Sequence, residues 1–276
     1  MERTVSIPYG ELELKASIHY PEPNAQQESE TRELCPLILI CHGFIGNRIG
    51  VNRLFVNAAR KFAKSGYIVV RFDYAGCGES EGEYGEGGLD SLISQTRTVL
   101  DYALESDYVD LSRVTLLGHS LGGAVALLTA ARDRRIKSLI LWSAVAHPFN
   151  DIVRIVGRST YDDSVRNGSA DHMGYALKPV FFESLASHQP FAEAGHFSGD
   201  VFLVHGTSDD VIPPDYASLY QKLFWARPGG ICDLKLIFQA DHTFSSGEHQ
   251  RELYEATLDW LNRHEQRKED WAHWEI

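Results

Sequence analysis

The sequence predicts an α/β fold, with a mostly parallel central sheet and helices on both of its faces. Short, continuous apolar runs recur along the chain, which is typical of strands buried on both faces of a parallel sheet. Helical stretches separate most of these runs, as in α/β proteins. A chain of 276 residues, 43% of them hydrophobic, is long enough for one large domain of this kind, and we expect a single domain over residues 1–276.

The expected elements follow in order along the chain. Val5–Ile7 and Leu12–His19 alternate partly between apolar and polar residues, which predicts an antiparallel hairpin at the sheet edge. A polar loop is expected over residues 21–32. Buried strands are expected at Leu37–Cys41, Tyr67–Phe72, Val114–Leu117, Leu139–Trp142, Val201–Val204 and Leu234–Phe238. Helices are expected at Arg53–Ser65, Leu89–Leu104, Leu121–Arg132, Tyr216–Phe224 and Glu248–Asn262.

One interval breaks this alternation. Residues 143–199 separate two expected core strands, although one short helix would connect them, and a structureless loop of that length is unusual in a compact domain. We therefore predict an inserted cap subdomain over residues 144–199. The interval is rich in aromatic residues: Phe149, Tyr161, Tyr175, Phe181, Phe182, Phe191 and Phe197. The alternative is that this segment only thickens the core.

Gly118-His119-Ser120-Leu121-Gly122 lies between an expected strand and an expected helix. The G-x-S-x-G pattern is common by chance, but at a sharp strand-to-helix turn it has a physical reason. The small residues let strand and helix approach closely, and the turn exposes the serine hydroxyl above the carboxyl edge of the sheet. Ser120 is therefore the expected catalytic nucleophile.

A serine hydroxyl needs a general base, and the base needs a third group to orient it. His242 follows the last expected strand and is the expected base, whereas His205, His249 and His264 lie at a strand end or on helical stretches. The acid is expected after the strand Val201–Val204, where Asp209 and Asp210 are adjacent. Asp209 is the preferred candidate, with Asp210 as a solvated or turn-capping carboxylate.

The negative charge that develops on a substrate carbonyl needs fixed donors. The N–H of Leu121, directly after the nucleophile, is one expected donor. The N–H of Phe44, in the loop after Leu37–Cys41, is the other, and Gly43 beside it allows close backbone approach. His42 is expected to be a structural residue of that loop.

These motifs together resemble the α/β-hydrolase superfamily over nearly the whole chain. They are His42–Phe44, Gly118–Gly123, His205–Asp210 and Ala240–His242, together with the loop Phe72–Ser80, where Asp73 and the glycines are expected to shape a turn. Within the superfamily, the loop continuing through Ile45–Arg48, the chain length and the length of the insertion resemble the bacterial cinnamoyl (feruloyl) esterases and small carboxylesterases. In that group the insertion roofs a pocket for an aromatic acyl group.

The expected function is a serine carboxylesterase acting on small acyl or aryl esters, including hydroxycinnamoyl esters, through an acyl-enzyme. A thioesterase, or an amidase or peptidase, would use the same triad, and a non-enzymatic binding module of this fold is the alternative from another class. No metal or organic cofactor is expected, and the partner is a small-molecule ester. The oligomeric state stays open, with the cap or an edge strand available as an interface.

Composition disfavours other classes of partner, and we expect the protein to be cytoplasmic. The net charge of −12 disfavours nucleic acid and anionic membranes as partners. No apolar run is long enough to span a bilayer, and no signal peptide is expected, because Met1–Gly10 is polar and strand-like. The four cysteines lack the spacing of a zinc site, so free thiols in a reducing compartment are expected.

Overall fold

The computed structural model describes residues 1–22 and 34–272, without the side chains of residues 264, 265 and 268–272. Most of the loop expected at 21–32 therefore lies outside the described residues. Among the helices that are described, none combines the length and the apolar character needed to cross a membrane.

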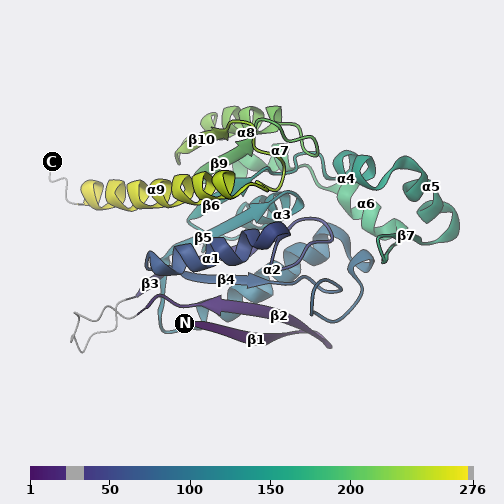
Figure 1. The fold of residues 1–276 in the computed structure, drawn as a ribbon, viewed down its shortest axis with the longest axis horizontal. Coiled ribbons are helices and arrows are strands. Elements are labelled where there is room, and N and C mark those ends of the chain that lie inside the picture. The colour runs from purple at the N-terminus through teal and green to yellow at the C-terminus, as the bar shows by residue number, and fades with distance from the viewer. Residues whose placement is uncertain (23–33, 273–276) are drawn as a thin grey trace.

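An eight-stranded sheet forms the centre of the described structure, in the order β1-β2-β4-β3-β5-β6-β9-β10 (Figure 1). The strands β1 and β2 are antiparallel to each other, β2 is antiparallel to β4, and every other neighbouring pair is parallel. The bounds are β1 Glu2–Tyr9, β2 Leu12–His19, β3 Cys35–Cys41, β4 Ile68–Phe72, β5 Val109–His119, β6 Ser138–Trp142, β9 Asp200–Gly206 and β10 Cys232–Ile237. The predicted edge hairpin and mostly parallel sheet are confirmed.

Helices cover both faces of the sheet because both faces of its strands are apolar. In β3, Leu37 and Leu39 pack into the core on one face, and Ile38 and Ile40 pack into the core on the other. Helices α1 and α9 cover the face of Ile38, and α2, α3 and α8 cover the opposite face. The bounds are α1 Leu54–Lys64, α2 Gly88–Leu104, α3 Leu121–Ala130, α8 Asp215–Trp225 and α9 Gly247–Ala272, with short 3₁₀ turns at Val51–Arg53 (η1) and Tyr84–Glu86 (η2).

Strand β5 is longer than the sequence predicts, since it begins at Val109 and not at Val114. Its pairing with β3 shifts between Cys35, which is opposite Val109, and Leu37, which is opposite Val114. The intervening residues bulge out of the ladder, and their exposed, largely polar character conceals the strand in the sequence.

The segment between β6 and β9 folds into helices and a small hairpin. Its elements are α4 Pro148–Val156, α5 Arg158–Asn167, β7 Ala170–His172, β8 Tyr175–Leu177, α6 Pro179–Ser187, α7 Pro190–Glu193 and η3 Ala194–His196. A proline in the first turn begins three of the helices, where its missing N–H costs nothing. Figure 1 shows α4, α5, α6 and β7 projecting beyond the carboxyl ends of the central strands. We call residues 144–199 the insertion.

The insertion packs against the start of α2 and the turn η2 before it. The Asp90 carboxylate lies 2.9 Å from both His188 Nε2 and Ser184 Oγ. A Cβ on Gly85 would lie only 2.0 Å from the Ala176 carbonyl oxygen, so the contact there is backbone to backbone. Phe181 and Phe182 are buried in the same apolar cluster as β3 and α3. Part of the aromatic content of the insertion therefore belongs to the main core.

Candidate active site

Ser120 sits in a strained turn between β5 and α3. Its backbone has φ 58° and ψ −125°, which L-residues rarely adopt and which costs conformational energy. The carbonyl of Ser120 accepts hydrogen bonds from the N–H groups of Gly123 and Val145, at 2.9 and 3.0 Å. These bonds hold the turn in place.

The glycines around Ser120 are required by close backbone contacts. A Cβ on Gly118 would lie 2.2 Å from the carbonyl oxygen of Gly122. A Cβ on Gly122 would lie 2.2 Å from the carbonyl oxygen of Cys41, at the end of β3. The start of α3 is therefore packed directly against the backbone of its neighbouring strands, as the sequence pattern indicates.

His242 lies within hydrogen-bond distance of the nucleophile. Its Nε2 atom is 3.0 Å from Ser120 Oγ, and its Nδ1 atom is 2.8 Å from Asp209 Oδ2. The acceptor Asp209 fixes the proton on Nδ1, so that Nε2 is free to accept the serine proton. The structure thus brings together Ser120, His242 and Asp209, which are far apart in the sequence.

Asp209 is surrounded by donors. Its Oδ1 atom accepts the N–H groups of Val211 at 3.0 Å and Ile212 at 2.8 Å. Its Oδ2 atom lies 3.0 Å from His205 Nε2 as well as 2.8 Å from His242. Burial alone would raise the pKa of Asp209, but the hydrogen bonds from His205, His242 and the Ile212 N–H outweigh it and hold the pKa well below its ordinary value. Asp209 is therefore ionised near neutral pH, beside His242.

Neither the neighbouring acid nor the other histidines replace these residues. Asp210 is exposed. His205 contacts the acid and not the serine, since it is buried at the end of β9 and its Nε2 atom also faces the Ile212 carbonyl at 3.1 Å. His249 lies on α9 and is half-buried. The side chain of His264 is outside the described residues.

His119 was not singled out by the sequence. Its Nε2 atom donates a 2.8 Å hydrogen bond to the main-chain oxygen of His242, and the two rings lie 4.9 Å apart. Burial, aided by the nearby His242, lowers the pKa of His119 to about 3, so its imidazole is neutral near pH 7. Only its place between the glycine and the serine of G-x-S-x-G marks it in the sequence.

The two expected oxyanion donors belong to residues in the segments next to Ser120. Leu121 is the first residue of α3, so its N–H has no partner within the helix. Phe44 lies in the turn after β3, and a Cβ on the adjacent Gly43 would be only 3.1 Å from Ser120 Cβ. The Phe44 ring lies 5.8 Å from that of Phe181 and 6.0 Å from that of His172, both in the insertion. The insertion is thus in contact with the loop beside the nucleophile.

No cluster of three or more His, Cys, Asp or Glu side chains is arranged to hold a metal ion in the part of the chain described. The residues themselves supply a buried carboxylate on Asp209, an oriented imidazole on His242 and a hydroxyl on Ser120, each hydrogen-bonded to the next. That arrangement can transfer a proton from serine to histidine.

Comparisons with known proteins agree with the fold described above. Residues 36–164 match the family model of the alpha/beta hydrolase fold. The solved structure of Est1E from Butyrivibrio proteoclasticus with ferulic acid bound superposes with a TM-score of 0.78 and 25% identity, over 94% of this chain and 98% of that one. The chain is an α/β-hydrolase fold protein. The mostly parallel sheet with its flanking helices is the expected one.

Relatives by sequence match over shorter stretches. An uncharacterized 31.7 kDa protein of Escherichia coli is 37% identical over 111 residues, which are 40% of this chain and 38% of that protein. The mitochondrial palmitoyl-protein thioesterase ABHD10 of Mus musculus is 26% identical over 187 residues, 64% of this chain and 60% of that one. The chain thus spans less than two thirds of the length of these relatives.

Proposed function

We propose that this α/β-hydrolase is a serine esterase that hydrolyses small acyl or aryl esters through an acyl-enzyme. The observation that carries the proposal is the hydrogen-bonded series from Ser120 Oγ through the His242 imidazole to the buried Asp209 carboxylate, with distances of 3.0 and 2.8 Å. The strained backbone of Ser120 supports it, since strain of this kind is concentrated at functional sites.

The acylation step follows from this arrangement. Ser120 Oγ attacks the ester carbonyl carbon while its proton passes to His242 Nε2, and the C–O bond to the alcohol then breaks. The alkoxide leaves with the proton from His242. Asp209 stabilises the imidazolium and does not itself take the proton. Water then attacks the acyl-enzyme by the same route, releasing the acid and restoring the Ser120 hydroxyl.

The tetrahedral intermediate carries a negative oxygen, for which the N–H groups of Leu121 and Phe44 are the proposed donors. Leu121 is the first residue of α3, and Phe44 lies in the turn after β3. Donors held in place before the reaction need no reorganisation as charge develops, and each is worth about 10²–10³ in kcat in serine hydrolases.

An aryl acyl group, including hydroxycinnamoyl, is the proposed substrate class. Support comes from the aromatic side chains of the insertion beside Phe44 and from Est1E, whose solved structure holds ferulic acid. A thioester is the second candidate, because a mouse relative is a palmitoyl-protein thioesterase. The same residues would also serve an amidase or peptidase, which is a third outcome for a substrate panel.

The first test is Ser120→Ala. Activity on a p-nitrophenyl acyl ester is expected to fall by about six orders of magnitude, since removal of this nucleophile in other serine hydrolases has such an effect. A fluorophosphonate probe should label the wild-type protein and leave the variant unlabelled. A variant that keeps most of its activity would exclude Ser120 as nucleophile, and a wild-type protein with no activity and no labelling would favour a binding module.

The second test is a comparison of kcat/KM for methyl ferulate, short and long p-nitrophenyl esters, an acyl-CoA and an aminoacyl anilide. We expect the highest value on an aryl or short acyl ester. A higher value on the acyl-CoA would replace the esterase assignment with a thioesterase, and a higher value on the anilide would replace it with an amidase.

A further inference from the structure

The loop that carries the Phe44 N–H leaves β3 at Cys41 and runs to Gly50. It turns sharply, since the Gly46 N–H donates to the Gly43 carbonyl at 3.1 Å and Ile45 has a positive φ of 42°. A Cβ on Gly46 would lie 3.1 Å from both Gly43 O and His42 Nδ1. We call residues 42–50 the oxyanion loop. Its conformation is costly for the chain and needs support from outside the loop.

The beginning of the oxyanion loop is supported by His42. Its Nδ1 atom lies 2.8 Å from the Gly43 carbonyl oxygen, and its Nε2 atom lies 3.1 Å from the Tyr74 N. Since a backbone N–H is only a donor, Nε2 accepts and Nδ1 carries the proton. Burial lowers the pKa of His42 to about 4, against the raising effects of the Gly43 bond and of Asp73, so the imidazole is neutral near pH 7.

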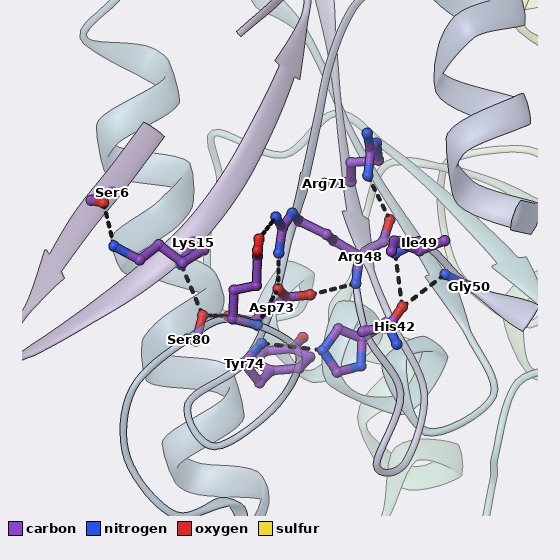
Figure 2. Close-up of polar contacts among 12 residues, drawn as sticks. Ser6, Lys15, His42, Arg48, Ile49, Gly50, Arg71, Asp73, Tyr74 and Ser80 are labelled. Carbon is purple, nitrogen blue, oxygen red and sulfur yellow. Dashed lines mark hydrogen bonds and ion pairs between the residues drawn. The ribbon is translucent and has the colours of Figure 1, made fainter. Parts of the chain in front are cut away.

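The other end of the oxyanion loop is held by Asp73, the residue before Tyr74. The main-chain N–H of Arg48 donates to Asp73 Oδ1 at 2.5 Å, and the Arg48 guanidinium bonds to Asp73 Oδ2. Figure 2 shows the carboxylate pointing at the Arg48 backbone and the guanidinium folded back over it. The Asp73 side chain is 0% exposed. This is a buried charge that acts on the backbone of the loop as well as on its arginine.

Asp73 itself cannot move easily. Its N–H donates to the Lys15 carbonyl of β2 at 2.9 Å, and its own carbonyl accepts the Ser80 hydroxyl at 2.7 Å. A Cβ on Gly78 would lie 2.3 Å from Asp73 Oδ2, so the Gly78 backbone packs directly against the carboxylate. The Arg48 carbonyl is fixed separately, because it accepts a 3.0 Å bond from Arg71 Nη1 of β4 (Figure 2).

We propose that Asp73 is a positioning residue for the hydrolase reaction, which through its bonds to Arg48 fixes the oxyanion loop and with it the Phe44 N–H. The beginning of the loop is fixed by the bond between His42 and the N–H of Tyr74. Tyr74 follows Asp73 directly, so one chain segment holds both ends of the loop. This inference rests on the proposed function of Ser120. A turn-forming role alone would need only the bonds of Asp73 within its own segment, such as that from the Glu79 N–H at 3.0 Å.

The test is Asp73→Asn, which keeps the size of the side chain. Its amide can present one oxygen, so it must lose either the acceptor for the Arg48 N–H or the acceptor for the guanidinium. We expect kcat to fall about 10- to 100-fold with KM within about threefold, since misplacement of a catalytic group by about 1 Å has an effect of this size. The dependence of kcat/KM on pH should keep its shape, because Ser120, His242 and Asp209 are unchanged.

A tetrahedral analogue separates a positioning role from a structural one. A trifluoromethyl ketone forms an oxyanion on Ser120, so its inhibition constant should rise in parallel with the loss of kcat/KM. Glu79→Gln is the matched control, because Glu79 bonds the other arm of the Arg48 guanidinium and is 68% exposed. It should leave kcat, KM and the inhibition constant within about twofold of wild type, like other surface substitutions.

The outcomes are distinct. A folded Asp73→Asn variant with wild-type kcat, or with lost kcat but unchanged analogue binding, overturns the inference. A loss of kcat that only matches the fraction of sites unlabelled by a fluorophosphonate overturns it as well. If Asp73→Asn does not fold, Arg48→Gln decides in the same way, with kcat expected to fall at least about tenfold at unchanged KM. An active Ser120→Ala variant would instead defeat the proposed function.

Discussion

The imidazole of His119 donates a hydrogen bond of 2.8 Å to the main-chain oxygen of His242. His119, the residue before the nucleophile Ser120, thus holds the backbone of His242, the proposed general base. Ser120 and His242 are 122 positions apart in the chain, and this bond ties their two loops together. It adds to the direct contact between Ser120 and His242 without involving the reacting atoms.

We predict that His119→Phe lowers kcat about fivefold. Phenylalanine keeps an aromatic ring against His242 but loses the donor, and one hydrogen bond of this kind contributes about 1 kcal/mol. Steady-state kinetics on a p-nitrophenyl ester would measure the effect. His196→Phe is the control, since the His196 side chain is 68% exposed in the insertion. Equal kcat for His119→Phe and wild type would show that this bond does not position His242.

The second prediction separates two adjacent carboxylates. Asp209→Asn should lower kcat about 10⁴-fold, because an amide in place of the carboxylate favours the wrong tautomer of the imidazole. Asp210→Asn should leave kcat within about twofold, since Asp210 is exposed. Both variants keep the side-chain size, so the pair is measured on one ester at one pH. A large loss in Asp210→Asn alone would reverse the assignment of the acid.

The placement of these side chains could be predicted because parallel strands end at one edge of the sheet. Ser120 follows β5, Asp209 follows β9 and His242 follows β10, so the order of buried strands brings three distant residues together. Asp209 was preferred over its neighbour, and in the structure its carboxylate is the one that contacts His242. The pattern of apolar residues does not distinguish Asp209 from Asp210. The turn that buries Asp209 and exposes Asp210 does.

The contacts of single side chains could not be predicted in the same way. The chain has 12 histidines, and nothing in the sequence says that His205 reaches Asp209 while His119 reaches the His242 backbone. The Asp73 bond to the Arg48 N–H depends on where two loops cross. The individual helices and strands of the insertion were not predicted either, because they are short and part of their apolar content serves the main core.

The third prediction concerns the packing of the elbow. Gly122→Ala should lower the free energy of unfolding by several kcal/mol, since the new methyl would lie 2.2 Å from the Cys41 carbonyl oxygen and the backbone must shift. Gly195→Ala is the matched control, because a Cβ there meets no atom within 4 Å. Urea denaturation of the two variants would measure the difference. Similar midpoints for Gly122→Ala and Gly195→Ala would mean that α3 can retreat from β3 at little cost.

The fourth prediction is that the protein loses stability as the pH falls from about 6.5 to about 4. Burial lowers the pKa of His19 to about 4, with Arg71 acting in the same direction, and His42 and His119 have pKa values of about 4 and about 3. In the unfolded chain these imidazoles bind protons near pH 6.5, so in this window the unfolded state holds more protons than the folded one. The contribution to stability is complete above pH 6.5 and is lost toward pH 4.

Each of these three histidines contributes a slope of up to about 1.4 kcal/mol per pH unit. Asp209 acts in a different window: its pKa is lowered, so its contribution is present above the ordinary carboxyl pKa of about 4 and is lost only below it. Urea denaturation at several pH values between 4.5 and 7.5 would measure the slope. His19→Gln keeps an acceptor for the Arg71 Nε–H, 2.9 Å away in the wild type, and removes one titrating group, so it should flatten the slope while activity is retained. A free energy of unfolding that does not change between pH 4.5 and 6.5 would mean that these buried imidazoles take up protons without unfolding.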